Sequence, residues 1–69
     1  MTNSDLLRKK ISESGYKMEF IAQEIGITRQ SLSKKVKNES AFDQYEIQAI
    51  CKVLGIESLE EKERIFFAA

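Results

Sequence analysis

The stretch that decides the fold is FIAQEIGITRQSLSKKVKN, from Phe20 to Asn38. Its first half carries three apolar side chains at positions i, i+1 and i+4, which are Ile21, Ala22 and Ile25. This spacing predicts one apolar stripe on a short helix. Gly26 can adopt the left-handed backbone that ends a helix, and Thr28 is a favourable cap for the next one. Because about three residues connect the two helices, they must cross steeply, which predicts a helix-turn-helix.

Three further helices are predicted around this pair. One begins at Asn3 or Ser4 and ends near Ser14, just before a glycine. A second begins at Asp43, where DQYE has the pattern of a capping box, and a third begins at Ser58, where SLEE has the same pattern. The sequence therefore predicts an all-α fold, a compact bundle of five short helices in a single domain over residues 1–69. The expected core consists of Leu7, Ile11, Ile21, Ala22, Ile25, Ile27, Leu32, Val36, Phe42, Ile47, Ile50, Cys51, Leu54 and Ile56.

Composition limits the classes of protein to which the chain can belong. It has 69 residues, no histidine and a single cysteine, Cys51. One cysteine without histidine provides neither an internal disulfide nor a zinc site, so we expect no metal and no cofactor. No apolar run approaches the ~18 residues that span a membrane. A single cysteine fits a reducing, intracellular setting, so we expect a cytoplasmic protein. A nucleophile needs an oriented base and a water-excluding pocket, which a surface helix of a small domain does not provide, so we expect no enzyme.

Charge is distributed unevenly along a chain whose formal net charge is zero. Residues 1–40 carry eight cations and five acids, whereas residues 41–69 carry three cations and six acids. The segment from Ile27 to Asn38 holds four cations and no acid. A protein polarised in this way can present a basic face to an anionic partner and remain soluble.

The helix predicted from Arg29 to about Lys37 has one narrow apolar edge and one broad polar face. With Arg29 at zero on a helical wheel, Leu32 and Val36 lie at ~300° and ~340°. The polar face holds Arg, Ser, Lys and Gln, residue types that suit a DNA groove. Arg can donate two bonds to guanine, Gln can pair with adenine, and Lys provides a charge for phosphate.

The same stretch resembles the helix-turn-helix of the phage Cro and repressor type, the lambda repressor-like DNA-binding domains of the XRE family. The shared pattern consists of Ile21–Ala22, then Ile25–Gly26–Ile27–Thr28, then Leu32. A second segment, YEIQAICKVLGI, is similar to the fourth helix of these domains. The resemblance covers roughly residues 4–57 and implies that the third helix enters the major groove.

Site residues follow from this resemblance. The base contacts that it implies are Thr28, Arg29, Gln30, Ser33 and Lys34. The phosphate contacts that we expect are Lys17, Met18, Lys35, Lys37 and Asn38. Two positions depart from the family pattern: Met18 stands where many members have glutamine, and Lys35 stands where an apolar residue is usual. The second departure leaves open whether Lys34 or Lys35 faces the groove.

The function that we expect is sequence-specific regulation of transcription, with the protein acting as a Cro-like repressor in a bacterial or phage-infected cell. The expected partner is double-stranded DNA with a pseudo-palindromic operator, bound by a homodimer, with no membrane and no small-molecule ligand involved. Three terminal side chains belong either to the core or to a dimer contact: Ile65, Phe66 and Phe67. The alternative is a protein-interaction module, such as an antitoxin or anti-repressor partner, that uses the acidic terminal helix.

Overall fold

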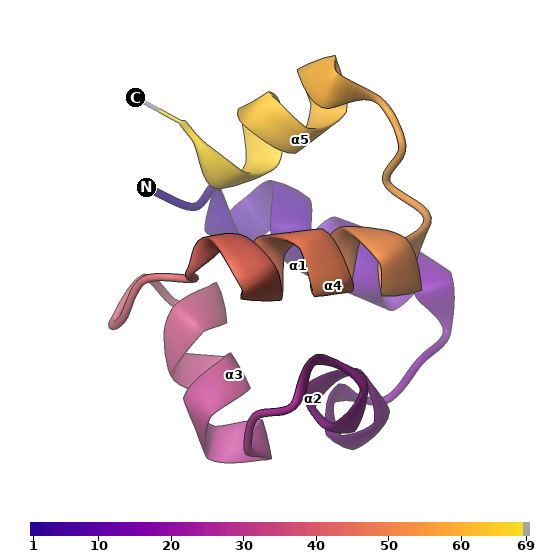
Figure 1. Cartoon of the computed structure of the whole chain (residues 1–69), viewed down its shortest axis with the longest axis vertical. Coiled ribbons are helices and arrows are strands. Elements are labelled where there is room, and N and C mark those ends of the chain that lie inside the picture. The colour runs from indigo at the N-terminus through magenta and orange to yellow at the C-terminus, as the bar shows by residue number, and fades with distance from the viewer. Residues whose placement is uncertain (69) are drawn as a thin grey trace.

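The computed structural model describes residues 1–68, and all of the regular structure in that range is helical. The elements are α1 (Ser4–Ser14), α2 (Met18–Ile25), α3 (Arg29–Val36), α4 (Gln44–Leu54) and α5 (Leu59–Phe66). Figure 1 shows α4 across the middle, with α1 behind it, α5 on one side, and α2 and α3 on the other. The predicted all-α bundle of five short helices is confirmed for the described residues.

Local capping explains where the helices begin. Asn3 caps α1 by accepting a bond from the backbone N–H of Leu6, and Thr28 and Ser58 cap α3 and α5 in the same manner. Asp43 caps α4 with the full capping box that the sequence predicts, in which the Glu46 side chain accepts from the Asp43 N–H. Helix α2 differs, because Lys17 occupies the cap position and makes no side-chain capping bond.

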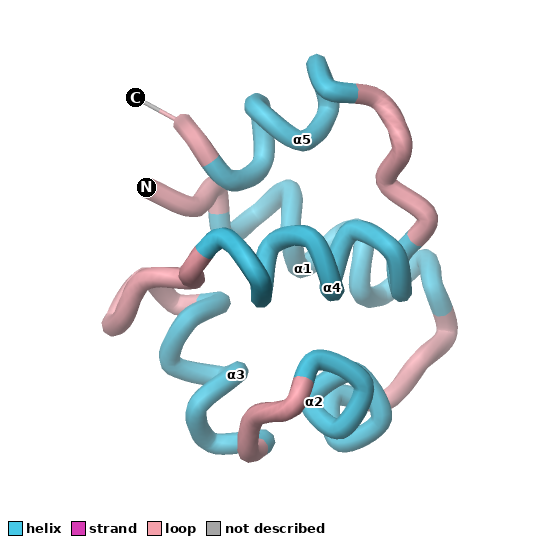
Figure 2. The backbone as a smooth tube through the Cα atoms, in the orientation of Figure 1, coloured by secondary structure: helices cyan, strands magenta, loops and turns pink. Residues whose placement is uncertain are grey.

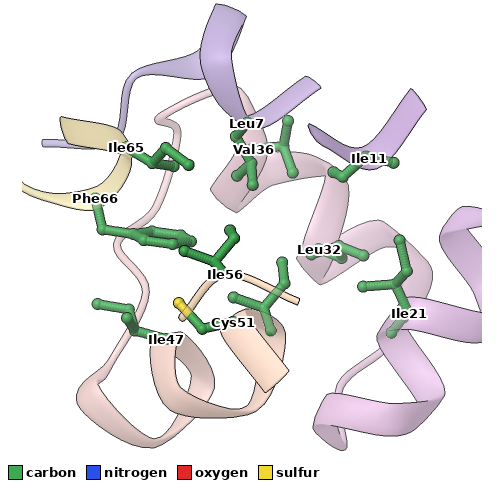
Figure 3. Close-up of a cluster of buried hydrophobic side chains, with 12 residues drawn as sticks. Leu7, Ile11, Ile21, Leu32, Val36, Ile47, Cys51, Ile56, Ile65 and Phe66 are labelled. Carbon is green, nitrogen blue, oxygen red and sulfur yellow. The ribbon is translucent and has the colours of Figure 1, made fainter. Parts of the chain in front are cut away.

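The core lies where the five helices converge (Figure 3). Its largest fully buried side chains are Leu7, Ile21, Leu32, Ile50 and Ile65. Most residues expected in the core are buried, while four are only partly buried at its edge: Ile25, Ile27, Phe42 and Leu54. The core also includes Ile65 and Phe66, which answers the question that the sequence left open for these two side chains. The rings of Phe66 and Phe42 pack in a T-shaped arrangement, with 5.5 Å between their centroids.

The first residues of the chain connect the ends of α3 and α5. The backbone N–H of Asn3 donates to the carbonyl of Ile65 at 2.6 Å. The Ser4 hydroxyl donates to the carbonyl of Val36 at 2.6 Å. These bonds hold α3 against the rest of the bundle at its C-terminal end.

No helix in the described part of the chain is long and apolar enough to cross a membrane.

Candidate nucleic-acid interface

The junction between α2 and α3 determines the orientation of α3 relative to α2. Residues 26–28 form the connection, visible as the short loop between these helices in Figure 2. Gly26 has φ 81°, which is the left-handed conformation that its sequence position predicts. The N–H of Ile27 donates to the carbonyl of Ala22 at 3.0 Å. Because Ala22 is small and buried, the two helices can approach closely at the turn.

Helix α3 is anchored by one edge, which leaves its polar face open. Leu32 is fully buried and Val36 nearly so, and both point into the core. Most of the expected contact residues on or next to α3 are exposed: Thr28, Arg29, Gln30, Lys34 and Lys37. Ser33 is partly buried. Within the described residues, none of these cations makes an ion pair, so their charges are available to an anionic partner.

Lys35 points away from this face. Its Nζ lies 2.8 Å from Oε1 of Glu46 and donates to the carbonyl of Ala41 at 2.9 Å. The two charged side chains are only 13% and 12% exposed, so the pair is largely withdrawn from solvent. This contact accounts for a lysine at a position where the family usually has an apolar residue. The geometry does not favour the phosphate contact expected of Lys35. Because Lys35 faces α4, the neighbouring Lys34 lies on the exposed side of α3.

Asn38 is likewise engaged within the protein. Its side-chain amide accepts from the N–H of Thr2 at 3.0 Å and donates to the carbonyl of the same residue at 2.5 Å. Its backbone is left-handed, with φ 66°, a conformation that asparagine tolerates better than most residues. An amide that makes both bonds to the N-terminal segment is poorly placed to bind a phosphate as well. The phosphate contact expected of Asn38 is therefore not favoured by this arrangement.

The beginning of α2 has free positive character. Lys17 is exposed, and Met18 is partly buried against the core. The Lys17 side chain makes no capping bond, so the first N–H groups of α2 have no side-chain acceptor from the cap residue. The N-terminal end of a helix also carries a partial positive charge. Both features suit a phosphate oxygen, and the backbone of Met18 can serve there although its side chain cannot.

The terminal aromatic residues have different environments. Ile65 and Phe66 are buried, whereas Phe67 is 60% exposed. Phe67 borders a cleft between α4 and α5, and Leu59, which is 69% exposed, lines the same cleft. The sequence reasoning did not single out Leu59. The signal was its place beside the cap of α5, about two helical turns before Ile65 and Phe66, which face the core.

Cys51 lies in the core, as the sequence predicts. The thiol is buried in the core, and burial raises its pKa. The charge of Lys62 lowers this pKa and that of Glu61 raises it, both to a smaller extent. A thiol with a raised pKa is protonated at neutral pH and is a poor nucleophile or metal ligand. Among the described residues, no group of three metal-ligating side chains gathers around it or elsewhere.

Together, the steep pair α2–α3, the open polar face of α3 and the supporting α1 and α4 define a helix-turn-helix domain of the DNA-binding class. A family model described as Helix-turn-helix matches residues 6–62 of the 69. The chain belongs to this family, the XRE type that includes lambda repressor and Cro, whose members are DNA-binding transcription regulators. Neither the curated proteins nor the solved structures gave a match.

Proposed function

We propose that this protein is a Cro-like transcriptional repressor that inserts α3 into the major groove of double-stranded DNA. The observation that carries the proposal is the outward face of α3. Arg29, Gln30 and Lys34 are exposed there, while Leu32 holds the opposite edge in the core. A helix held in this way can enter a groove ~12 Å wide without unfolding any of its supports.

Base recognition is assigned to the N-terminal half of α3. The Arg29 guanidinium can donate two bonds to guanine O6 and N7, and the Gln30 amide can pair with adenine. Lys34 lies one helical turn after Gln30 and reaches the same groove. Thr28 and Ser33 border this face, and their hydroxyls can bond to bases or phosphates. The described part of the chain places no acid within α3 to oppose these contacts.

Phosphate contacts are assigned to the two ends of the helix-turn-helix. Lys17 and the free N–H groups at the beginning of α2 bind one stretch of backbone. Lys37, exposed just after α3, binds the backbone at the other end of the groove. Lys35 and Asn38 are left out of this set, because their polar groups already have partners within the chain.

The size of the molecule supports a homodimer on a pseudo-palindromic operator. The molecule measures 26 × 23 × 21 Å, so one copy does not reach two successive major-groove faces, which lie ~34 Å apart. One short recognition helix also provides few contacts for useful affinity. Phe67 and Leu59 form an exposed apolar surface on α5 and its end, and we assign the dimer contact to them.

The test is selection of bound DNA from a random pool by the full chain, followed by affinity measurements across a range of salt concentrations. We expect one enriched site with two related halves, and an affinity that falls steeply with salt because phosphates are neutralised. Transcription from a promoter that overlaps the site should decrease when the protein is added. A protein-interaction module would enrich no sequence and would show no salt-sensitive binding, which would overturn the proposal.

A further inference from the structure

A cleft opens where α1, the beginning of α2 and α3 meet. Its lining is Arg8, Ile11, Ser12, Met18, Ser33, Val36 and Lys37. We propose that this cleft holds a backbone phosphate of bound DNA and that Arg8 of α1 is its main ligand. The inference rests on the proposed DNA-binding function and extends it, because it makes α1 a third element of the interface.

Arg8 reaches the cleft because of the orientation of α1 about its own axis. Leu7 and Ile11 point into the core, and Arg8 lies ~100° around the helix from Leu7. The same flank of α1 carries Ser4, whose hydroxyl bonds to the carbonyl of Val36 in α3 at 2.6 Å. The opposite flank carries Lys10, which pairs with Glu61 of α5 at 2.9 Å. Arg8 therefore lies on the side of α1 that faces α3.

The opposite wall comes from α3. Ser33 and Lys37 are one helical turn apart and lie beside the outward face that carries Lys34. The floor is apolar, since Ile11 and Val36 are core residues, both labelled in Figure 3. Two cations thus border the cleft from two helices, and two hydroxyl-bearing residues, Ser12 and Ser33, add hydrogen-bond donors.

Charge distinguishes this cleft from its neighbour on α1. No carboxylate lines it, and neither Arg8 nor Lys37 makes an ion pair in the part of the chain that the structure describes. The cleft between α1 and α5 also carries cations, but Glu13 and Glu61 line it too. Two unpaired cations beside one cleft favour an anion between them, because each is stabilised by the opposite charge.

A phosphodiester is the anion that this position favours. The Arg guanidinium offers a planar fork that matches the oxygens of a phosphate. The cleft adjoins the uncapped beginning of α2 through Met18, which adds the positive end of a helix dipole. A phosphate seated here lies directly beside the groove that α3 is proposed to occupy. The same DNA strand can therefore contact α1, α2 and α3.

The test compares Arg8→Ala with Lys9→Ala, a matched control on the same helix. Lys9 is an exposed cation that lines the cleft on the α5 side. Fluorescence anisotropy should measure the affinity of each full-length variant for the selected site and for a random duplex, over a range of salt. We expect Arg8→Ala to weaken both duplexes by a similar factor and to reduce the salt slope by about 0.9, the value for one phosphate. Lys9→Ala should leave the slope unchanged.

The conservative variants make the result specific to the guanidinium. Arg8→Lys should keep the salt slope and lose part of the affinity, because it retains the charge and loses the fork. Arg8→Gln keeps a long side chain without the charge, and it serves if the alanine variant does not fold by circular dichroism. An unchanged slope and affinity in the neutral variants would overturn this inference alone. If the unmodified protein showed no salt-dependent binding to any duplex, both this inference and the proposed function would be wrong.

Discussion

Two adjacent lysines of α3 have opposite surroundings. Lys34 is exposed, whereas the ammonium of Lys35 contacts Glu46 and the carbonyl of Ala41. Neighbouring residues on a helix lie ~100° apart, so one step along the sequence can turn a side chain from solvent to the core. A count of basic residues therefore overstates the charge that α3 can offer to DNA.

At the residue scale, Arg29→Ala should lower discrimination at one base pair of the operator. The loss should be about 1–3 kcal/mol, because a bidentate pair with guanine is removed. Competition binding between the selected site and its single-position variants measures this preference. Lys52→Ala, an exposed cation on α4 beside Tyr16 and Phe20, is the control and should keep the preference. An unaltered ranking of the site variants in Arg29→Ala would contradict the assigned base contact.

At the element scale, α3 is positioned by the turn before it and by its contact with α4. An added Cβ at Gly26 would meet no heavy atom within 4 Å, so space does not explain the glycine. Its φ of 81° does, because an L-residue with a side chain is strained in the left-handed region. The need for glycine at this position therefore comes from backbone conformation and not from lack of space.

Gly26→Ala should lower the free energy of unfolding by about 1 kcal/mol for this reason. Gly26→Asn is the matched variant and should lose less, because asparagine tolerates the left-handed conformation. Urea unfolding followed by circular dichroism measures both. Equal stability of the alanine variant and the unmodified protein would show that the turn does not need this conformation.

The Lys35–Glu46 pair should be coupled more strongly than an exposed pair. A double-mutant cycle with Lys35→Met and Glu46→Gln should give about 1.5–3 kcal/mol, since both partners are largely buried and hydrogen-bonded. Glutamine retains an oxygen for the capping bond to Asp43. The exposed pair Arg64–Glu60 in α5 is the control and should give about 0.3–0.5 kcal/mol. A coupling no larger than that of the control would show that the Lys35–Glu46 pair does not hold α3 against α4.

At the scale of the whole molecule, the first and last described residues, Met1 and Ala68, lie together. The N–H of Ala68 donates to the carbonyl of Met1 at 2.9 Å, and Figure 1 shows the beginning of the chain beside the end of α5. Asn38, just after α3, bonds to Thr2 in the same region. The end of α3 is therefore supported directly by the N-terminal segment, which in turn is bonded to Ala68.

Phe67→Ser should weaken self-association and leave the fold intact, because this side chain is 60% exposed. Sedimentation equilibrium should show a shift toward monomer, and affinity for a two-half site should fall while thermal unfolding changes little. Phe20→Ser, at another exposed aromatic residue, is the control for a general loss of apolar surface. A monomer–dimer equilibrium that Phe67→Ser does not change would exclude this surface as the dimer contact.

Much of the fold could be predicted, because caps and apolar stripes act over three or four residues. Thr28, Asp43 and Ser58 begin the helices that the sequence predicts, and Leu32 and Ile50 are buried as their periodicity requires. The outward direction of Arg29 follows from the same periodicity, whereas the directions of Lys34 and Lys35 were left open by the sequence and were decided by the contact of Lys35 with Glu46. The cleft at Arg8 could not be predicted, since its walls come from helices distant in the sequence.

The amino-acid sequence by itself determined the number of helices, their ends and the polar face of α3, because each depends on interactions between close neighbours. Only the tertiary structure decided which polar side chains remain free for DNA. Lys35 bonds to Glu46, which is eleven residues away in the sequence, and Asn38 bonds to Thr2, which is 36 residues away. Such bonds form only after the helices pack, because packing brings distant groups within hydrogen-bonding distance and withdraws them from water.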